Sequence, residues 1–310
     1  MSVLSARPLG ITRNAQPSLW TAVRETVPDF WELTKPEVNL LILVATFTGF
    51  YLGYPRGSNP FPFERLFHVL AGTLLVASGA GALNQYLEYG FDARMRRTSR
   101  RPVAAGRLSP ISAFWFGISL AVIGAAYLLL FANALAASLA VITLLSYLFT
   151  YTPLKRKTPL CTVPGAFAGA MPPLIGWAAA CGSIASAQAW ALYAMLFFWQ
   201  FPHFMAIAWM YREDYAQAGY LVLPARSEKS FLAWLTAVPS IALLLASFAA
   251  IKHADDRTLP LCASVILGLG LLFYVWRQLV LRSKAAARQL LKATIAYLLL
   301  QMLVLAVSKR

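Results

Sequence analysis

Seven stretches of this chain contain no Asp, Glu, Lys or Arg, and each is close to or above the length of a membrane span. They cover residues 38–55, 66–87, 108–154, 158–211, 230–251, 258–276 and 293–308. A helix needs roughly 20 mostly apolar residues to cross a hydrocarbon layer about 30 Å thick. The two longest stretches therefore each hold two spans, with polar breaks near Asn133 and Ser183. The pattern predicts an all-α, polytopic membrane protein with nine transmembrane helices.

Composition agrees with this class, since 59% of the residues are hydrophobic and only 13% are charged. Soluble domains are usually about 45–50% apolar and about 25% charged. A net charge of +15 makes nucleic acid the first partner to consider, but the chain leaves no soluble domain to bind it. We expect the positive charge instead to orient the protein and to meet an anionic substrate at the inner membrane face. The three cysteines are widely spaced, which argues against both a disulfide framework and a zinc site.

The Lys and Arg residues also predict the orientation, because cytoplasmic connections carry an excess of positive charge. With a cytoplasmic N-terminus, only six of the 27 fall on the other side: Arg56, Arg65, Lys252, Arg257, Lys309 and Arg310. Nine spans then place the C-terminus in the periplasm, across the cell inner membrane. Residues 1–33 lack the apolar segment of a signal peptide. We interpret them as a cytoplasmic tail with a short interfacial helix near residues 20–31, and residues 34–310 as one transmembrane domain.

A row of oxygen-bearing side chains ends the second expected span. Asn84, Glu88 and Asp92 are four residues apart, so they share one helix face over about 12 Å. Three oxygen ligands in a row suit a hard cation such as Mg²⁺. The simpler interpretation is a solvated helix end that marks the exit from lipid.

Two further features favour the metal site. A basic block follows the row and contains Arg94, Arg96, Arg97, Arg100, Arg101 and Arg107. Carboxylates that hold a cation, followed by guanidinium groups that bind phosphate oxygens, are typical of a metal-bridged diphosphate site. Some of these arginines serve topology alone. A second acidic pair, Glu213 and Asp214, is expected at the same membrane face and completes the prediction.

Other polar residues are expected at this face. Lys35 precedes the first span, and Tyr151, Lys155 and Arg156 follow the fourth. Taken singly, Lys35 is explained equally well as a snorkelling anchor, and Tyr151 as part of an interfacial aromatic belt. Their common location favours a role in binding the diphosphate.

The ionisable residue His203 falls inside an expected span. Such residues are functional candidates because they are costly in a membrane, and imidazole commonly ligates heme iron. The alternative is a hydrogen-bonded core histidine. The preceding Pro202 is expected to bend the helix, and the pair Pro172–Pro173 is expected to do the same in the fifth span.

Four stretches resemble the heme O synthases (protoheme IX farnesyltransferases), a branch of the UbiA-type intramembrane prenyltransferases. They are Thr34-Lys35-Pro36 and residues 84–110, 151–177 and 200–224. The resemblance implies helices around a central cavity, with Mg²⁺-dependent binding of farnesyl diphosphate under a cytoplasmic cap. By position, Asn84, Glu88 and Asp92 look like the first metal–diphosphate motif and Asp214 like the remaining carboxylate of the second. Tyr211 and Tyr215 stand where quinone-type relatives have aspartates. Heme O synthases share this departure.

The activity implied by the resemblance is transfer of a farnesyl group to a vinyl group of heme b, with addition of water. Heme b is then a substrate, Mg²⁺ the cofactor, and His203 a heme contact. Asn84, Asp92 and Asp214 carry catalysis. The expected diphosphate contacts are Lys35, Arg94, Arg97, Arg101, Tyr151, Lys155 and Arg156. Expected partners are membrane lipid and, in heme A and heme O biosynthesis, heme A synthase or oxidase assembly factors, with no nucleic acid.

Three alternatives remain open from the sequence. One is a UbiA-type enzyme that acts on a quinone precursor or a chlorin. Another is a transporter or channel, although transport sites usually lie near the bilayer midplane, whereas these acids gather at one face. The third is a non-catalytic heme-binding assembly factor for terminal oxidases.

Overall fold

The computed structural model describes residues 19–55, 60–221, 229–251 and 257–309, and this part of the chain is helical without any strand. The first 18 residues of the expected tail lie outside the described residues, as does the loop that contains Arg226. The helices in chain order are α1 (Leu19–Leu33), α2 (Pro36–Gly53), α3 (Phe63–Asp92), α4 (Pro110–Phe131), α5 (Ala134–Leu145), α6 (Thr152–Leu154), α7 (Thr162–Gly169), α8 (Pro172–Cys181), α9 (Ala187–Met210), α10 (Arg212–Ala218), α11 (Lys229–Ile251), α12 (Thr258–Leu281) and α13 (Lys284–Val307). A π-helical turn, Ser146–Tyr151, joins α5 to α6, and a 3₁₀ turn, Pro159–Cys161, precedes α7.

Eight helices in the described residues are long and apolar enough to cross a membrane. They are α2, α3, α4, α9, α11, α12, α13 and the continuous segment Ala134–Leu154. The expected all-α, polytopic architecture is therefore confirmed. The remaining predicted span, the fifth, is built from two short helices in series, α7 and α8, and neither is long enough to cross alone.

The interruption between α7 and α8 follows from the proline pair that begins α8. Pro172 and Pro173 have no N–H and therefore cannot continue the hydrogen bonds of α7, but proline is favoured in the first turn of a new helix. Hydrogen bonds from the amides of Ala170 and Met171 to the carbonyls of Ala166 and Ala168 close α7. The sequence predicted a bend at the proline pair, and the structure shows a full break between two helices instead.

Close contact between α2 and α8 depends on glycine. A Cβ atom at Gly49 would overlap the backbone carbonyl of Pro173, and one at Gly176 would overlap that of Thr46. Small residues allow membrane helices to approach backbone to backbone, where van der Waals contact replaces the hydrophobic effect. This contact packs α8 closely against α2.

Asn133 and Gly182 lie at the two positions where the sequence predicted breaks between spans. The Asn133 side chain accepts a hydrogen bond from the amide of Ala136 at 2.8 Å, which caps α5, and donates to the carbonyl of Ala178 at 2.8 Å. Gly182 ends α8 with a left-handed backbone, φ 74°, which glycine adopts without strain.

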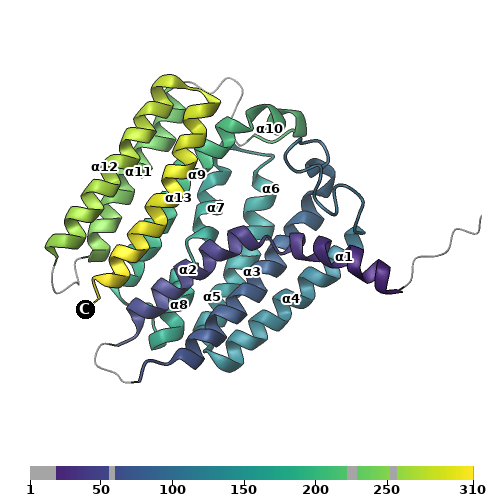
Figure 1. Ribbon diagram of the computed structural model, residues 1–310, viewed down its shortest axis with the longest axis horizontal. Helices are drawn as coiled ribbons and strands as arrows, with labels where there is room; N and C mark the ends of the chain where they lie inside the picture. The colour runs from purple at the N-terminus through teal and green to yellow at the C-terminus, as the bar shows by residue number, and fades with distance from the viewer. Residues whose placement is uncertain (1–18, 56–59, 222–228, 252–256, 310) are drawn as a thin grey trace, which may run out of the picture.

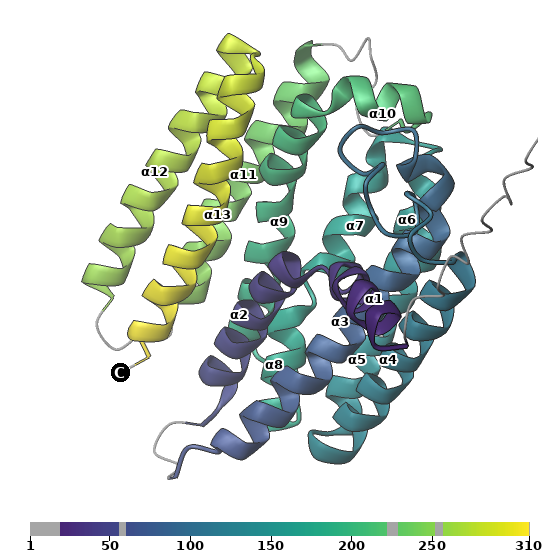
Figure 2. The same cartoon turned by 45° about the vertical axis from the view of Figure 1, so that its right-hand side comes forward.

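One end of the bundle carries the long connections. The short helix α10 and the connection between α3 and α4, residues 93–109, lie side by side there, above the ends of α3 and α9 (Figures 1 and 2). Helix α1 lies crosswise over the outside of α3, rather than parallel to the spans (Figure 2). The two acidic motifs are thus brought to one end of the molecule.

Candidate functional site

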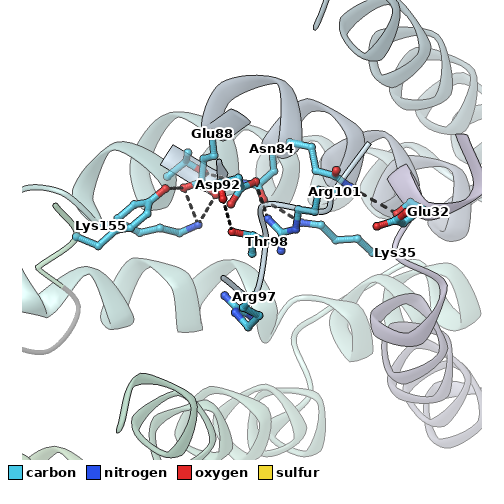
Figure 3. Close-up of polar contacts among 12 residues, drawn as sticks. Glu32, Lys35, Asn84, Glu88, Asp92, Arg97, Thr98, Arg101 and Lys155 are labelled. Carbon is cyan, nitrogen blue, oxygen red and sulfur yellow. Dashed lines mark hydrogen bonds and ion pairs between the residues drawn. The ribbon is translucent and has the colours of Figure 1, made fainter. Parts of the chain in front are cut away.

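The row at the end of α3 is buried, which rules out the simpler interpretation of a solvated helix end. Asn84, Glu88 and Asp92 are 2%, 5% and 1% exposed, respectively. Buried carboxylates require partners, since an unpaired charge is costly away from water. Each carboxylate here has a basic partner, and Figure 3 shows these partners on both sides of the row.

Glu88 is the most heavily bonded residue of the site. Both of its carboxylate oxygens accept hydrogen bonds from Lys155 Nζ at 3.0 Å. Asn84 Nδ2 donates to Oε2 at 2.8 Å, and the Tyr220 hydroxyl donates to Oε1 at 2.9 Å. Four hydrogen bonds from three donor groups therefore converge on one carboxylate, from α3, the segment after α6 and the segment after α10.

Asp92 is bound by the connection that follows it. Arg101 Nη1 donates to Asp92 Oδ2 at 2.7 Å, and the Thr98 hydroxyl donates to the backbone carbonyl of Asp92 at 2.9 Å. Charge-assisted bonds of this length are among the stronger hydrogen bonds in proteins. They fold residues 93–101 back over the end of α3, so that the basic block covers the acidic row.

Lys35 approaches the row from the other side. Its Nζ donates to Asn84 Oδ1 at 2.9 Å, and its backbone has a left-handed conformation, φ 54°. A non-glycine residue in this conformation is strained by about 1–3 kcal/mol. Burial and the positive charges of Arg101 and Lys155 lower the pKa of the Lys35 ammonium to about 7. Three basic side chains thus face two carboxylates, and no ion pair joins Lys35 to a carboxylate in the described residues.

Lys155 is held by a buried carboxylate and by an aromatic ring. Burial disfavours its charge, but the Glu88 carboxylate outweighs burial and holds the pKa of Lys155 well above its usual value. Its ammonium lies 4.5 Å from the centre of the Tyr151 ring, at a distance typical of cation–π contact. Tyr151 ends the π-helical turn, a feature frequent at functional sites. Lys155 thus contacts the row directly, and Tyr151 lies beside Lys155.

The second acidic motif divides into one residue inside the site and one outside it. Asp214 is 9% exposed, and its Oδ2 accepts a hydrogen bond from the backbone N–H of Arg97 at 3.3 Å. Glu213 is exposed and pairs with Lys284 at the start of α13, 3.1 Å away. The structure therefore joins Asp214 to the basic block after α3 and turns Glu213 away.

The two tyrosines beside Asp214 hold Arg97. The guanidinium carbon lies 5.0 Å from the centre of the Tyr211 ring and 5.9 Å from that of Tyr215, and Arg97 Nη2 donates to the Tyr215 hydroxyl at 3.3 Å. Arg94 and Arg156 are exposed, and both lie over the ring of Phe91. These two arginines thus border the site without contacting the carboxylates.

His203 belongs to a different group of residues. Its Nδ1 lies 2.9 Å from the hydroxyl of Thr294 on α13, and its ring stacks on that of Trp199 with centroids 4.5 Å apart. No hydrogen bond or ion pair joins His203 to the acidic row in the described residues. The structure thus separates the predicted heme contact from the predicted diphosphate contacts.

Sequence reasoning missed three residues of the site. Tyr220 donates to Glu88, the Thr98 hydroxyl donates to the carbonyl of Asp92, and the Thr152 hydroxyl lies 3.4 Å from Asn84 Nδ2. Burial and the Glu88 charge raise the pKa of the Tyr220 phenol, so it stays a donor. Proximity in sequence was the only signal available for these three residues, since each lies within a few residues of a predicted site residue. Hydroxyl groups alone have no distinguishing pattern.

A polytopic helical bundle with a buried, charge-rich site at one end defines the class: an integral membrane protein whose polar groups gather at one end of its spans. The model of the UbiA prenyltransferase family matches residues 42–300. The chain belongs to this family, in the group whose curated members are named protoheme IX farnesyltransferases.

Two of the relatives illustrate this membership. The protoheme IX farnesyltransferase of Solibacter usitatus is 42% identical over 87% of this chain and 94% of its own length. That of Koribacter versatilis is 39% identical over 94% of each chain.

Solved structures share the fold at low sequence identity. A digeranylgeranylglyceryl phosphate synthase gives a TM-score of 0.72 with 16% identity, covering 91% of this chain and 99% of that one. A UbiA homolog from Archaeoglobus fulgidus, bound to GPP and Mg²⁺, gives 0.65 with 14% identity, covering 89% and 99%.

Proposed function

We propose that the protein transfers the farnesyl group of farnesyl diphosphate to a vinyl group of heme b, with addition of water, to give heme O and diphosphate. The observation that carries the proposal is the contact between Asp214 of the second acidic motif and the basic block that follows the first. Asp214 accepts from the Arg97 backbone, which lies five residues beyond Asp92. One end of the bundle thus holds both motifs, three buried carboxylates and several cations, as a metal–diphosphate group requires.

Mg²⁺ is the cofactor that this donor set fits. Among the described residues, no group of three His, Cys, Asp or Glu side chains lies close enough to hold a metal. We therefore propose a mixed set of donors, in which one or two carboxylates from among Glu88, Asp92 and Asp214 act together with the Asn84 amide oxygen and the substrate phosphates. Such oxygens suit Mg²⁺, which keeps several waters and is held through one or two carboxylates and substrate phosphates. Mg²⁺ bound there would neutralise charge on the leaving diphosphate.

In this proposal the basic residues bind the diphosphate. Lys155 and Arg101 are paired with the carboxylates in the free protein and are placed to bind diphosphate oxygens when these carboxylates turn to the cation. Lys35 donates to the Asn84 amide oxygen and supplies a further positive charge. Charge stabilisation of this kind favours departure of the diphosphate with the electrons of the C1–O bond.

The acceptor step needs the apolar interior of the bundle. The electron-rich vinyl group of heme attacks C1 of the farnesyl chain, and water adds to the resulting porphyrin-conjugated cation with loss of a proton. Exclusion of water until the carbon–carbon bond has formed prevents hydrolysis of the farnesyl group. In this proposal His203, on α9, the helix that precedes the second motif, contacts the heme.

Orientation follows from charge. The connection at residues 93–109 and the segment 155–157 are basic and adjoin the site, so the positive-inside rule places this end of the bundle in the cytoplasm. We therefore propose an inner-membrane protein with a cytoplasmic N-terminus and a periplasmic C-terminus. Farnesyl diphosphate then enters from the cytoplasmic side, with its tail among the spans.

The test is incubation of the purified protein with heme b, farnesyl diphosphate and Mg²⁺, followed by mass spectrometry of the porphyrin. A farnesyl-hydroxyethyl heme is expected from the wild type, and none from Asp92→Ala or in the presence of a chelator. Insertion of Asp92→Ala into membranes should be normal. Transfer to a quinone precursor instead of heme would favour the alternative acceptor, and bound heme without consumption of farnesyl diphosphate would favour an assembly factor.

A further inference from the structure

The hydroxyl of Thr294 decides which nitrogen of His203 carries a proton. His203 Nδ1 lies 2.9 Å from Thr294 Oγ1, and the same oxygen lies 2.7 Å from the backbone carbonyl of Leu291. A carbonyl oxygen can only accept, and a hydroxyl has a single proton to donate. The Thr294 proton is therefore directed to Leu291. The hydroxyl then accepts from His203, so Nδ1 carries hydrogen.

The opposite arrangement is unfavourable. If Thr294 donated to a bare Nδ1, its oxygen and the Leu291 carbonyl would face each other at 2.7 Å without a proton between them. A doubly protonated ring would place a full charge within α9, where charge is expensive. The neutral ring with hydrogen on Nδ1 satisfies both contacts. Its lone pair is then on Nε2.

The ring is also held in place. Trp199 Nε1 donates to the backbone carbonyl of Thr294 at 2.6 Å, and the indole stacks on the imidazole at 25° between planes. Thr294 is fully buried, whereas His203 is only partly buried. Nε2 makes no hydrogen bond to the part of the chain that the structure describes. The clamped ring thus keeps its free nitrogen without a protein partner.

We propose that Thr294 is a positioning residue, which holds His203 so that the Nε2 lone pair binds the iron of the heme acceptor. The inference rests on the proposed function, because it takes heme b as the substrate. Metal-bound histidines almost always donate their other ring N–H to an acceptor, and loss of that acceptor typically costs 10–100-fold in metal affinity. Thr294 is such an acceptor.

The test is a titration of the purified, full-length protein in nanodiscs with heme b, followed by absorption spectroscopy. Thr294→Val removes the acceptor at nearly constant volume, and Thr294→Ser restores it. Metal-free protoporphyrin IX is the matched probe, since it has the same ring and no iron. We expect Thr294→Val to raise the Kd for heme b about tenfold or more and to weaken the spectrum of the imidazole complex. Thr294→Ser should bind heme b like the wild type, and all variants should bind protoporphyrin IX equally.

Two results with Thr294→Val, and a third with His203→Ala, would overturn the inference. One is a Thr294→Val protein with wild-type heme affinity and spectrum. The other is an equal loss of heme b and protoporphyrin IX, which would make Thr294 a packing residue only. His203→Ala must lose the imidazole spectrum in the same titration, and its retention would also refute the proposal. Farnesyl transfer by the wild type, measured on the same preparation, tests the proposed function separately.

Discussion

The hydroxyl of Tyr220 donates a hydrogen bond to Glu88 across 132 positions of sequence. This bond joins the end of α3 to the segment after α10, and so connects the two acidic motifs beyond the contact between Arg97 and Asp214. Tyr220 is 5% exposed, so water cannot replace Glu88 as the hydrogen-bond acceptor of its hydroxyl. Tyr220, which belongs to neither motif, therefore links the site to the segment after α10.

Replacement of Tyr220 by Phe should destabilise the protein by about 1–3 kcal/mol, because it removes one donor from a buried carboxylate. Denaturant unfolding in a detergent micelle measures the change. Tyr193→Phe is the matched control, since the Tyr193 hydroxyl makes no hydrogen bond in the described residues while its ring packs against Phe197. The control should change stability by less than about 0.5 kcal/mol. Equal effects of the two variants would contradict a role for the Tyr220 hydroxyl.

The two neighbouring acids after α9 should differ in their effects on catalysis. Asp214→Ala removes a buried carboxylate at the site, and we expect the rate of transfer to fall about 100-fold. Glu213→Ala removes only an exposed ion pair with Lys284, which solvent screens and which therefore contributes little to stability. Its rate of transfer should stay near that of the wild type. A large loss in Glu213→Ala would show that the exposed carboxylate turns into the site.

Diphosphate binding should weaken as the pH rises above 7. In the free protein the pKa of Lys35 is lowered to about 7, so the ammonium is charged below this pH and increasingly neutral above it. A bound anion favours the charged form, so binding above pH 7 must take up a proton, and affinity should fall by up to about tenfold per pH unit.

Calorimetry at pH 8, with inorganic diphosphate and Mg²⁺ in two buffers of different ionisation enthalpy, measures this proton uptake. Lys35→Met is the reference, because titration of the diphosphate itself is common to both proteins. The same uptake in Lys35→Met and wild type would assign the proton to another group.

Contact between α7 and α9 should depend on Gly169. A Cβ atom there would overlap the side-chain amide of Gln200, which donates to the carbonyl of Ala166 at 2.9 Å. Gly169→Ala should therefore destabilise the protein by about 1–3 kcal/mol through overpacking. Gly270→Ala is the matched control, because in the described residues no atom beyond the local helix backbone and the adjacent residues lies within 4 Å of the added carbon. A helical glycine without contacts should gain about 0.5–1 kcal/mol on this change, and a loss at Gly270 would indicate a general intolerance of helix substitution.

Much of the fold is determined locally by the sequence. The charge-free stretches predict the spans, because crossing a membrane requires length and apolar character within one segment. The spacing of Asn84, Glu88 and Asp92 places them on one face, because this depends only on helical periodicity. Pro172 and Pro173 predict an irregular fifth span, and the structure shows two helices there.

Tertiary structure alone decides the pairing of charges within the site. The sequence offers six arginines after α3, yet Arg101 binds Asp92, Arg97 binds Asp214 through its backbone, and Arg94 lies outside. Likewise the structure buries Asp214, exposes Glu213 and directs Tyr220 to Glu88. These outcomes depend on distances between segments far apart in sequence, and on which groups lose contact with water. Local periodicity and composition carry no information about either.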